Sequence, residues 1–143
     1  MSRTKKLGIA CAVLAVFIFL LNIFAMQRSW YFFVWWFDMP MHFLGGMWIG
    51  LMSAWMYFLG PFKKDSRVMS VAQVVCVALL SVFVVGVLWE GYEYFVQISI
   101  PGATVGNLFD SISDLFFDMA GASASAIYLI SHISFVKEGE STI

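Results

Sequence analysis

Long apolar runs separated by short polar or aromatic segments dominate the pattern of the chain. Four runs, at about residues 7–26, 38–59, 68–96 and 108–135, are each long enough to cross a bilayer as an α-helix. The pattern therefore predicts an all-α polytopic membrane protein. We expect a single domain, residues 1–143, folded as a bundle of four transmembrane helices.

The connecting segments differ in character. Residues 27–37 are rich in Trp and Tyr, whose rings prefer the headgroup level, so we expect an interfacial aromatic segment there. Residues 60–67 form a basic loop, residues 97–106 an uncharged one, and residues 137–143 a polar tail expected to be mobile. We interpret the first run as a transmembrane helix; a cleaved secretory signal peptide is the alternative.

Composition supports this interpretation. Hydrophobic residues make up 62% of the chain and charged residues 12%, about half the charge of a typical soluble domain. The sequence has no basic patch beyond short flanks, which argues against nucleic-acid binding. Cys11 and Cys76 both lie in apolar runs, so we expect small packing residues rather than a disulfide or a metal-thiolate pair.

The basic residues predict the orientation in the membrane. Of the eight Lys and Arg residues, all but Arg28 lie at the amino terminus, in the 60–67 loop or in the carboxyl-terminal tail. The positive-inside rule places these segments in the cytoplasm. We therefore predict a multi-pass protein of the bacterial inner (plasma) membrane, with both termini cytoplasmic (N-in/C-in) and the segments near 27–37 and 97–107 facing outward.

This topology brings most of the acidic residues together at the outer end of the bundle. Six of the nine carboxylates are predicted at similar depth on three helices: Asp38, Glu90, Glu93, Asp110, Asp114 and Asp118. His42 lies one turn deeper than Asp38, and the four-residue spacing of the last three aspartates stacks them on one helix face. Ionisable residues in a membrane helix face a bundle interior, a cation or water, because lipid does not solvate them.

Clustered carboxylates cannot all stay ionised in a poorly solvated site, so either they share protons or a cation lies among them. Oxygen ligands with one imidazole are typical of Zn²⁺, Mn²⁺, Fe²⁺ or Mg²⁺, and Ca²⁺ is also compatible. The predicted metal ligands are His42, Glu90, Glu93, Asp114 and Asp118. Asp38 is predicted to orient His42 or to act as a base, which makes the predicted catalytic set Asp38, His42, Glu90 and Asp114.

Structural roles compete with each of these assignments. Asp38 stands at a helix start next to Pro40 and can be an N-cap, and Asp110, in the first turn after Asn107, suits the helix dipole. His42 can be a hydrogen-bonded packing residue, and Glu90 and Glu93 can be solvated at the headgroups. His132 has no acidic partner nearby and is expected to be interfacial. The glycines expected to serve helix packing are Gly45, Gly46, Gly50 and Gly121.

Three short patterns resemble those of the VanZ-like and YjdF-like group of small bacterial inner-membrane proteins. They are Asp38-x-x-x-His42 with Gly45, Trp89-Glu90-x-x-Glu93, and Asp114-x-x-x-Asp118-x-x-Gly121. Asp118 stands where VanZ-like proteins usually have Asn. The resemblance implies a polytopic fold and, for some VanZ-like members, a link to glycopeptide resistance and the cell envelope. It implies no particular reaction.

Two functional hypotheses follow. The first is a metal-assisted hydrolase or transferase that acts on a lipid-linked head group in the cell envelope. The second is a non-catalytic, cation-binding or proton-sharing membrane module or subunit. A small transporter is disfavoured, since four short spans without discontinuous helices would need to oligomerise. The expected partner is therefore a membrane lipid or lipid-linked substrate, with a homo-oligomer left open.

Overall fold

The computed structural model describes residues 3–59, 70–99 and 108–132. Within these ranges the regular structure is helical throughout, with no strand. The helices are α1 (Arg3–Gln27), α2 (Trp30–Phe33), α3 (Asp38–Ala54), α4 (Val71–Ser99) and α5 (Leu108–His132), and a π-helix (Trp55–Leu59) directly continues α3. The prediction of an all-α fold is confirmed for the described residues.

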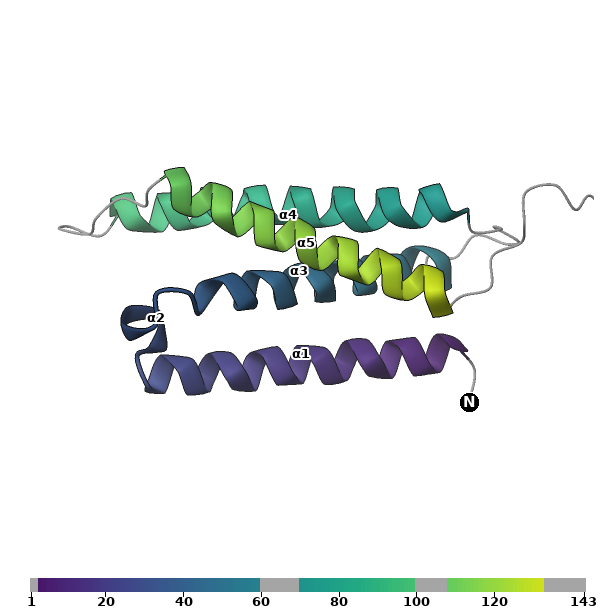
Figure 1. Cartoon of the computed structure of the whole chain (residues 1–143), viewed down its shortest axis with the longest axis horizontal. Coiled ribbons are helices and arrows are strands. Elements are labelled where there is room, and N and C mark those ends of the chain that lie inside the picture. Colours follow the sequence, from purple (N-terminus) through teal and green to yellow (C-terminus); the bar gives the residue numbers. More distant parts are fainter. Residues whose placement is uncertain (1–2, 60–69, 100–107, 133–143) are drawn as a thin grey trace, which may run out of the picture.

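The four long helices form an antiparallel bundle (Figure 1). Helices α1, α3 and α4 run along the long axis of the molecule, α5 crosses them obliquely, and α2 lies at the end where α1 is followed by α3 (Figure 1). The most extensive packing joins α3 to α5, and α4 packs against both of them. Helix α1 packs mainly on α3, with smaller contacts to α2 and the π-helix.

The observed helices differ in detail from the predicted spans. Helix α1 begins at Arg3 rather than at residue 7, and α4 runs from Val71 to Ser99 rather than over 68–96. The 27–37 segment contains the short helix α2. The basic loop at 60–67, Asn107, the predicted end of the last span near residue 135 and the tail at 137–143 all lie outside the described residues. That four helices cross the membrane stays a prediction.

Glycines set the close contact between α3 and α5. A Cβ at Gly46 would overlap the backbone of Asp118, and one at Gly121 would overlap the backbone of Phe43. The expected packing role of these two glycines is therefore confirmed. The expectation is wrong for Gly45, where a Cβ would meet no atom within 4 Å.

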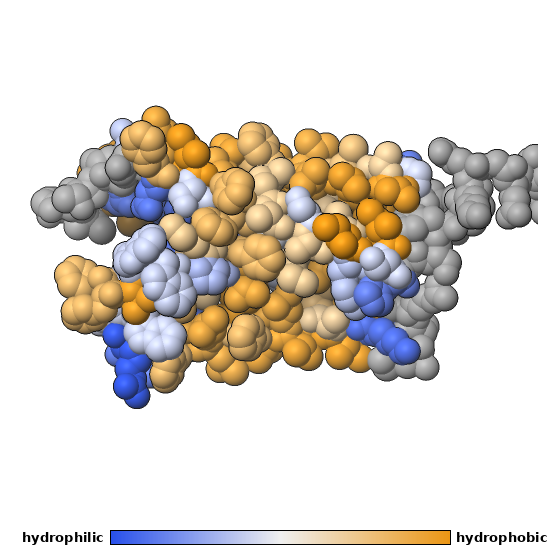
Figure 2. Space-filling view, viewed as in Figure 1, coloured by the Kyte–Doolittle hydropathy of each residue, from blue (hydrophilic) through white to orange (hydrophobic). Residues whose placement is uncertain are grey.

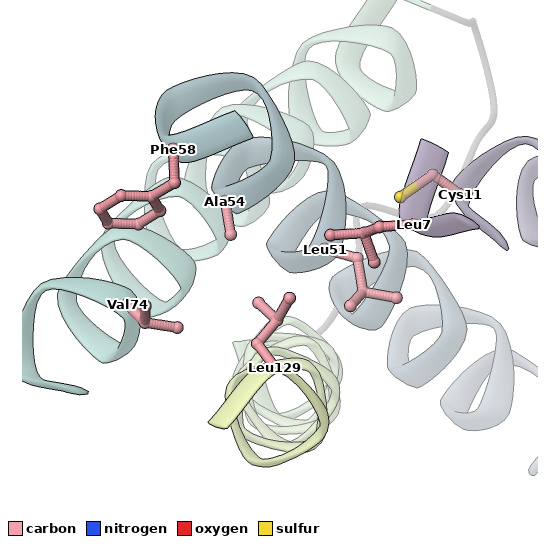
Figure 3. Close-up of a cluster of buried hydrophobic side chains, with 7 residues drawn as sticks. All are labelled: Leu7, Cys11, Leu51, Ala54, Phe58, Val74 and Leu129. Carbon is pink, nitrogen blue, oxygen red and sulfur yellow. The ribbon is translucent and has the colours of Figure 1, made fainter. Parts of the chain in front are cut away.

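An apolar cluster holds together the end of the bundle near the amino terminus. Figure 3 shows its seven side chains, which come from α1, α3, the π-helix, α4 and α5: Leu7, Cys11, Leu51, Ala54, Phe58, Val74 and Leu129. Cys11 is buried there as a free thiol, and Cys76 is free and exposed on α4. The expected packing role is confirmed for Cys11 and is wrong for Cys76.

The outer surface of the bundle is strongly apolar. Figure 2 shows hydrophobic residues over the middle of the visible face and hydrophilic residues gathered towards its two ends. Two helical stretches, Lys5–Gln27 and Val71–Ser99, are long and apolar enough to span a membrane. Large exposed side chains on them include Phe17 and Leu88. Contiguous apolar surface of this extent marks a membrane-facing protein.

Candidate Asp–His site

Helix α3 contributes Asp38 and His42. Asp38 is the first residue of α3, Phe37 is the N-cap, and no side chain caps this helix. The N-cap role considered for Asp38 is therefore not observed. Its carboxylate faces the imidazole one turn away instead, with 3.8 Å between Asp38 Oδ2 and His42 Nε2. The Asp38 side chain is 45% exposed, so it forms the accessible edge of the site.

Helix α5 contributes two buried carboxylates that meet the same imidazole. Asp114 Oδ2 lies 3.8 Å from His42 Nε2, and Asp118 Oδ1 lies 3.3 Å from His42 Nδ1. Both carboxylates reach α3 because Gly46 and Gly121 let the two helix backbones approach closely. His42 therefore has a carboxylate at each ring nitrogen.

Three of these residues are arranged as metal ligands would be. Asp38, His42 and Asp114 each offer one ligand atom, and the three atoms all lie within 4.8 Å of one another. Asp118 lies on the opposite ring nitrogen, where a carboxylate commonly orients a metal-bound histidine. The sequence instead predicts Asp118 as a ligand and Asp38 as the residue that orients His42 or acts as a base.

Helix α4 places its two glutamates around this group. Glu93 accepts a hydrogen bond from the Trp89 side chain and interacts electrostatically with Glu90, Asp38 and His42. Glu90 interacts electrostatically with Asp114, and its Oε1 is buried with no hydrogen-bond partner within the described structure. Neither glutamate belongs to the three-ligand group.

The remaining polar residues considered from the sequence lie at the edges. Asp110 is exposed in the first turn of α5, as its expected helix-dipole role requires. His132 is exposed at the other end of α5, where it stacks on Tyr128. Arg28 lies over the ring of Phe24, 5.3 Å from its centroid. Each described salt bridge at the site joins a carboxylate to the same imidazole, that of His42. Carboxylates therefore outnumber the cationic groups at the site.

A cavity of about 630 Å³ adjoins the site. Asp38, His42, Glu93 and Asp118 line it, together with residues from α1. Tyr31, in the segment between α1 and α3, also lines the cavity and donates a hydrogen bond of 2.7 Å to Asn22 Oδ1. Burial, and secondarily the charge of Asp38, raises the pKa of Tyr31, so its hydroxyl stays a neutral donor at physiological pH.

Asn22 is not among the residues predicted from the sequence. A signal was present, because Asn22 is the one amide side chain in the apolar run from residue 7 to residue 26. An amide in such a run needs a hydrogen-bond partner inside the protein, and Tyr31 supplies it.

Comparison with known proteins identifies the family. No curated protein and no solved structure matches the chain. The sequence model of the family described as "Predicted membrane protein (DUF2238)" matches residues 3–134, which include every residue of the Asp–His site. The chain therefore belongs to this family of predicted membrane proteins.

Proposed function

We propose that this membrane protein binds a divalent cation at Asp38, His42 and Asp114 and uses it to hydrolyse or transfer a lipid-linked head group. The observation that carries the proposal is the arrangement around His42. One ring nitrogen faces two carboxylates that can share a cation, and the other faces Asp118, which can hold the ring in place.

The spacing of the ligand atoms supports a small cation. Donors about 2.0–2.2 Å from a tetrahedral ion lie about 3.3–3.6 Å from one another. The two distances from His42 Nε2, each 3.8 Å, are close to this range. Because the Asp38 side chain is half-exposed, its carboxylate can move closer to His42 Nε2 and bring that distance into the range. Three protein ligands leave a position for water or substrate, as in catalytic zinc sites. Two carboxylates and an imidazole suit Zn²⁺, Mn²⁺, Fe²⁺ or Mg²⁺.

A cation held there would supply a Lewis acid for a phosphoryl oxygen. The chain would supply the remaining roles. Asp118 would fix the orientation of His42, and Glu90, whose buried oxygen lacks a donor, would accept a proton from water or from a substrate hydroxyl. With both termini cytoplasmic, the site faces outward, which favours a cell-envelope substrate. The resemblance to VanZ-like and YjdF-like proteins agrees with an envelope setting.

Metal content tests this proposal. We expect near-stoichiometric divalent metal in the detergent-purified protein, measured by plasma mass spectrometry, and its loss in His42→Ala and Asp114→Asn. His132→Ala and Asp110→Asn are matched controls, because they make the same changes on exposed parts of α5 and should retain the metal. Absence of metal after purification without chelator would contradict the proposal.

The second candidate is a non-catalytic module in which the site shares protons. The specific observation in its favour is that three carboxylates lie within 4 Å of the His42 ring, so a protonated imidazole can balance part of their charge without a cation. In that case the protein would carry no metal, and chelator would not change its unfolding temperature. A stable partner protein in a pull-down would then point to a subunit of a larger assembly.

A further inference from the structure

The cavity beside the Asp–His site has two chemically different parts. Its polar part lies near the α2 end of the bundle, around Asp38, His42 and Tyr31. Its other part extends along three helices and is apolar apart from the indole nitrogen of Trp48. Its lining there is Ala15, Ile18 and Phe19 of α1, Gly45, Trp48 and Ile49 of α3, and Val85 of α4.

The dimensions of the cavity match one leaflet of a bilayer. Its lining on α3 runs from Asp38 to Ile49, which is about 16 Å at 1.5 Å per residue. Half of a hydrocarbon core of about 30 Å is about 15 Å. The cavity therefore reaches from Asp38, at the level of the head groups, to Ile49, about the middle of the membrane, and its apolar part from Gly45 to Ile49 forms the deepest section, about 6 Å long.

Helix α3 forms the floor of the cavity, and α1 and α4 form its walls. Helix α1 packs on α3, and the packed helix pairs of the described structure do not include α1 with α4. Phe19 on one wall and Trp89 on the other both line the cavity and remain 62% and 49% exposed. The cavity is therefore reached from the side of the bundle, where lipid would surround the protein.

We propose that the cavity binds one acyl chain of an outer-leaflet glycerophospholipid, which enters sideways between α1 and α4 and brings its head group to Asp38 and His42. The chain-binding cavity is the new element, and the fate of the head group rests on the proposed function. An acyl chain fits because the apolar part ends at the depth of one leaflet, whereas a long isoprenoid chain would extend beyond it. The volume lies within the range of about 300–1,000 Å³ typical of small-molecule sites.

Two substitutions fill the cavity from different sides. A Cβ at Gly45 meets no atom within 4 Å, so Gly45→Leu adds a side chain to the floor without a backbone clash. Ala15→Leu fills the cavity from α1, on a different helix from His42. Gly91→Leu is the matched control, because Gly91 also has no neighbour within 4 Å but lies on the exposed side of α4.

The test is photo-crosslinking with a glycerophospholipid that carries a diazirine near the end of one acyl chain. We expect adducts on the apolar cavity residues in the wild type and in Gly91→Leu. Both filling variants should reduce these adducts by about tenfold, as expected for overpacking an occupied site. Equal labelling in the filling variants and the wild type would overturn the proposal. So would labelling spread evenly over outer residues such as Leu80 and Ile127, or competition by a polyprenyl phosphate in place of phospholipid.

Metal content of the same samples separates this proposal from the proposed function. Loss of the adducts with metal retained in Ala15→Leu would support both. Adducts in a wild type that holds no metal would support the lipid cavity and contradict the metal site. Metal in a wild type without cavity adducts would leave the metal site standing and overturn the lipid cavity.

Discussion

His42 joins two helices through its two ring nitrogens, and each nitrogen has a separate task in the proposed site. The Asp118 carboxylate accepts a hydrogen bond from His42 Nδ1, with 3.3 Å between the two atoms. His42 Nε2 is therefore free to face Asp38 and Asp114. Asp118→Asn would weaken this hold on the ring while preserving side-chain size. We expect a 10- to 100-fold loss of metal affinity, the usual effect of losing such an orienting partner, measured by metal titration of the purified protein.

Asp110→Asn provides the control for Asp118→Asn. It removes the same charge from the same helix and acts electrostatically on Asp38 and Asp114, but Asp110 is exposed and is not among the described ion-pair partners of His42. We expect little change in metal affinity. Equal losses in the two variants would show that only the summed negative charge matters, and would contradict an orienting role for Asp118.

Glu90 is a second residue whose surroundings predict its behaviour. A buried polar atom without a partner costs about 1–3 kcal/mol, so the Glu90 carboxylate is unfavourable unless a cation compensates it. In chelator we expect Glu90→Gln to unfold at the same or a higher temperature than the wild type. With saturating metal we expect a smaller rise in the unfolding temperature than the wild type shows. A variant destabilised equally in both conditions would indicate a purely structural role.

The sequence predicted which residues share a helix face but not which position each of them takes around His42. The four-residue spacings placed Asp38 with His42 and Asp114 with Asp118, and the structure brings these four side chains together. Which ring nitrogen each carboxylate meets depends on the depth at which α3 and α5 cross. That depth is set by backbone contacts at Gly46 and Gly121, which no periodicity reveals. The roles proposed for Asp38 and Asp118 therefore differ from those predicted from the sequence.

At the scale of helices, the contact between α3 and α5 is the element that positions the site. Gly121→Ala would drive a Cβ into the backbone of Phe43, which cannot move as a side chain can. We expect a loss of about 1–3 kcal/mol or more in unfolding free energy and weaker metal binding, measured by thermal unfolding in detergent and by titration. Gly91→Ala, in open space on α4, should be neutral or slightly stabilising. Comparable destabilisation by both would contradict this account.

Helix α1 is attached to the bundle less tightly than the other long helices are. One hydrogen bond between α1 and α3 allows this attachment to be tested. Trp48 Nε1 donates to the backbone oxygen of Cys11 at 3.0 Å. Trp48→Phe removes this donor, so α1 should separate from α3 more often and expose the buried Cys11 thiol. We expect faster labelling of Cys11 by a membrane-permeant maleimide, followed by mass spectrometry. Cys76, already exposed on α4, is the internal control. Unchanged Cys11 labelling would show that apolar contacts alone hold α1.

The helix boundaries show how much of the secondary structure the apolar pattern predicts. It located the four long helices to within a few residues where the structure describes their ends. It did not predict that the end of the second run becomes the π-helix Trp55–Leu59, or that α2 forms inside the aromatic segment. Both depend on tertiary contacts, such as the packing of Phe58 in the apolar cluster and the edge-to-face contacts of Trp30 with Phe24 and Phe37.

Over the whole molecule, the buried apolar cluster and the Asp–His site lie at opposite ends of the bundle. The apolar cluster around Leu7 and Leu129 packs the end near the amino terminus, whereas Asp38, His42 and Asp114 lie towards the α2 end. Helices α1 and α4 are apolar enough to meet lipid. Helices α3 and α5 hold His42, Asp114 and Asp118 between them, where these three side chains are largely buried.

Because the two ends of the bundle differ, the predicted orientation of the protein in the membrane can be tested. If both termini are cytoplasmic, the α2 end of the bundle faces outward and the start of α1 faces inward. In a Cys76→Ser background, where Cys11 stays buried, we expect an impermeant maleimide to label Phe32→Cys in intact cells, because Phe32 is highly exposed on α2. Lys6→Cys, exposed at the other end of α1, should be labelled only after permeabilisation. The reverse pattern would place the Asp–His site on the cytoplasmic side, so the proposed lipid substrate would have to come from the inner leaflet.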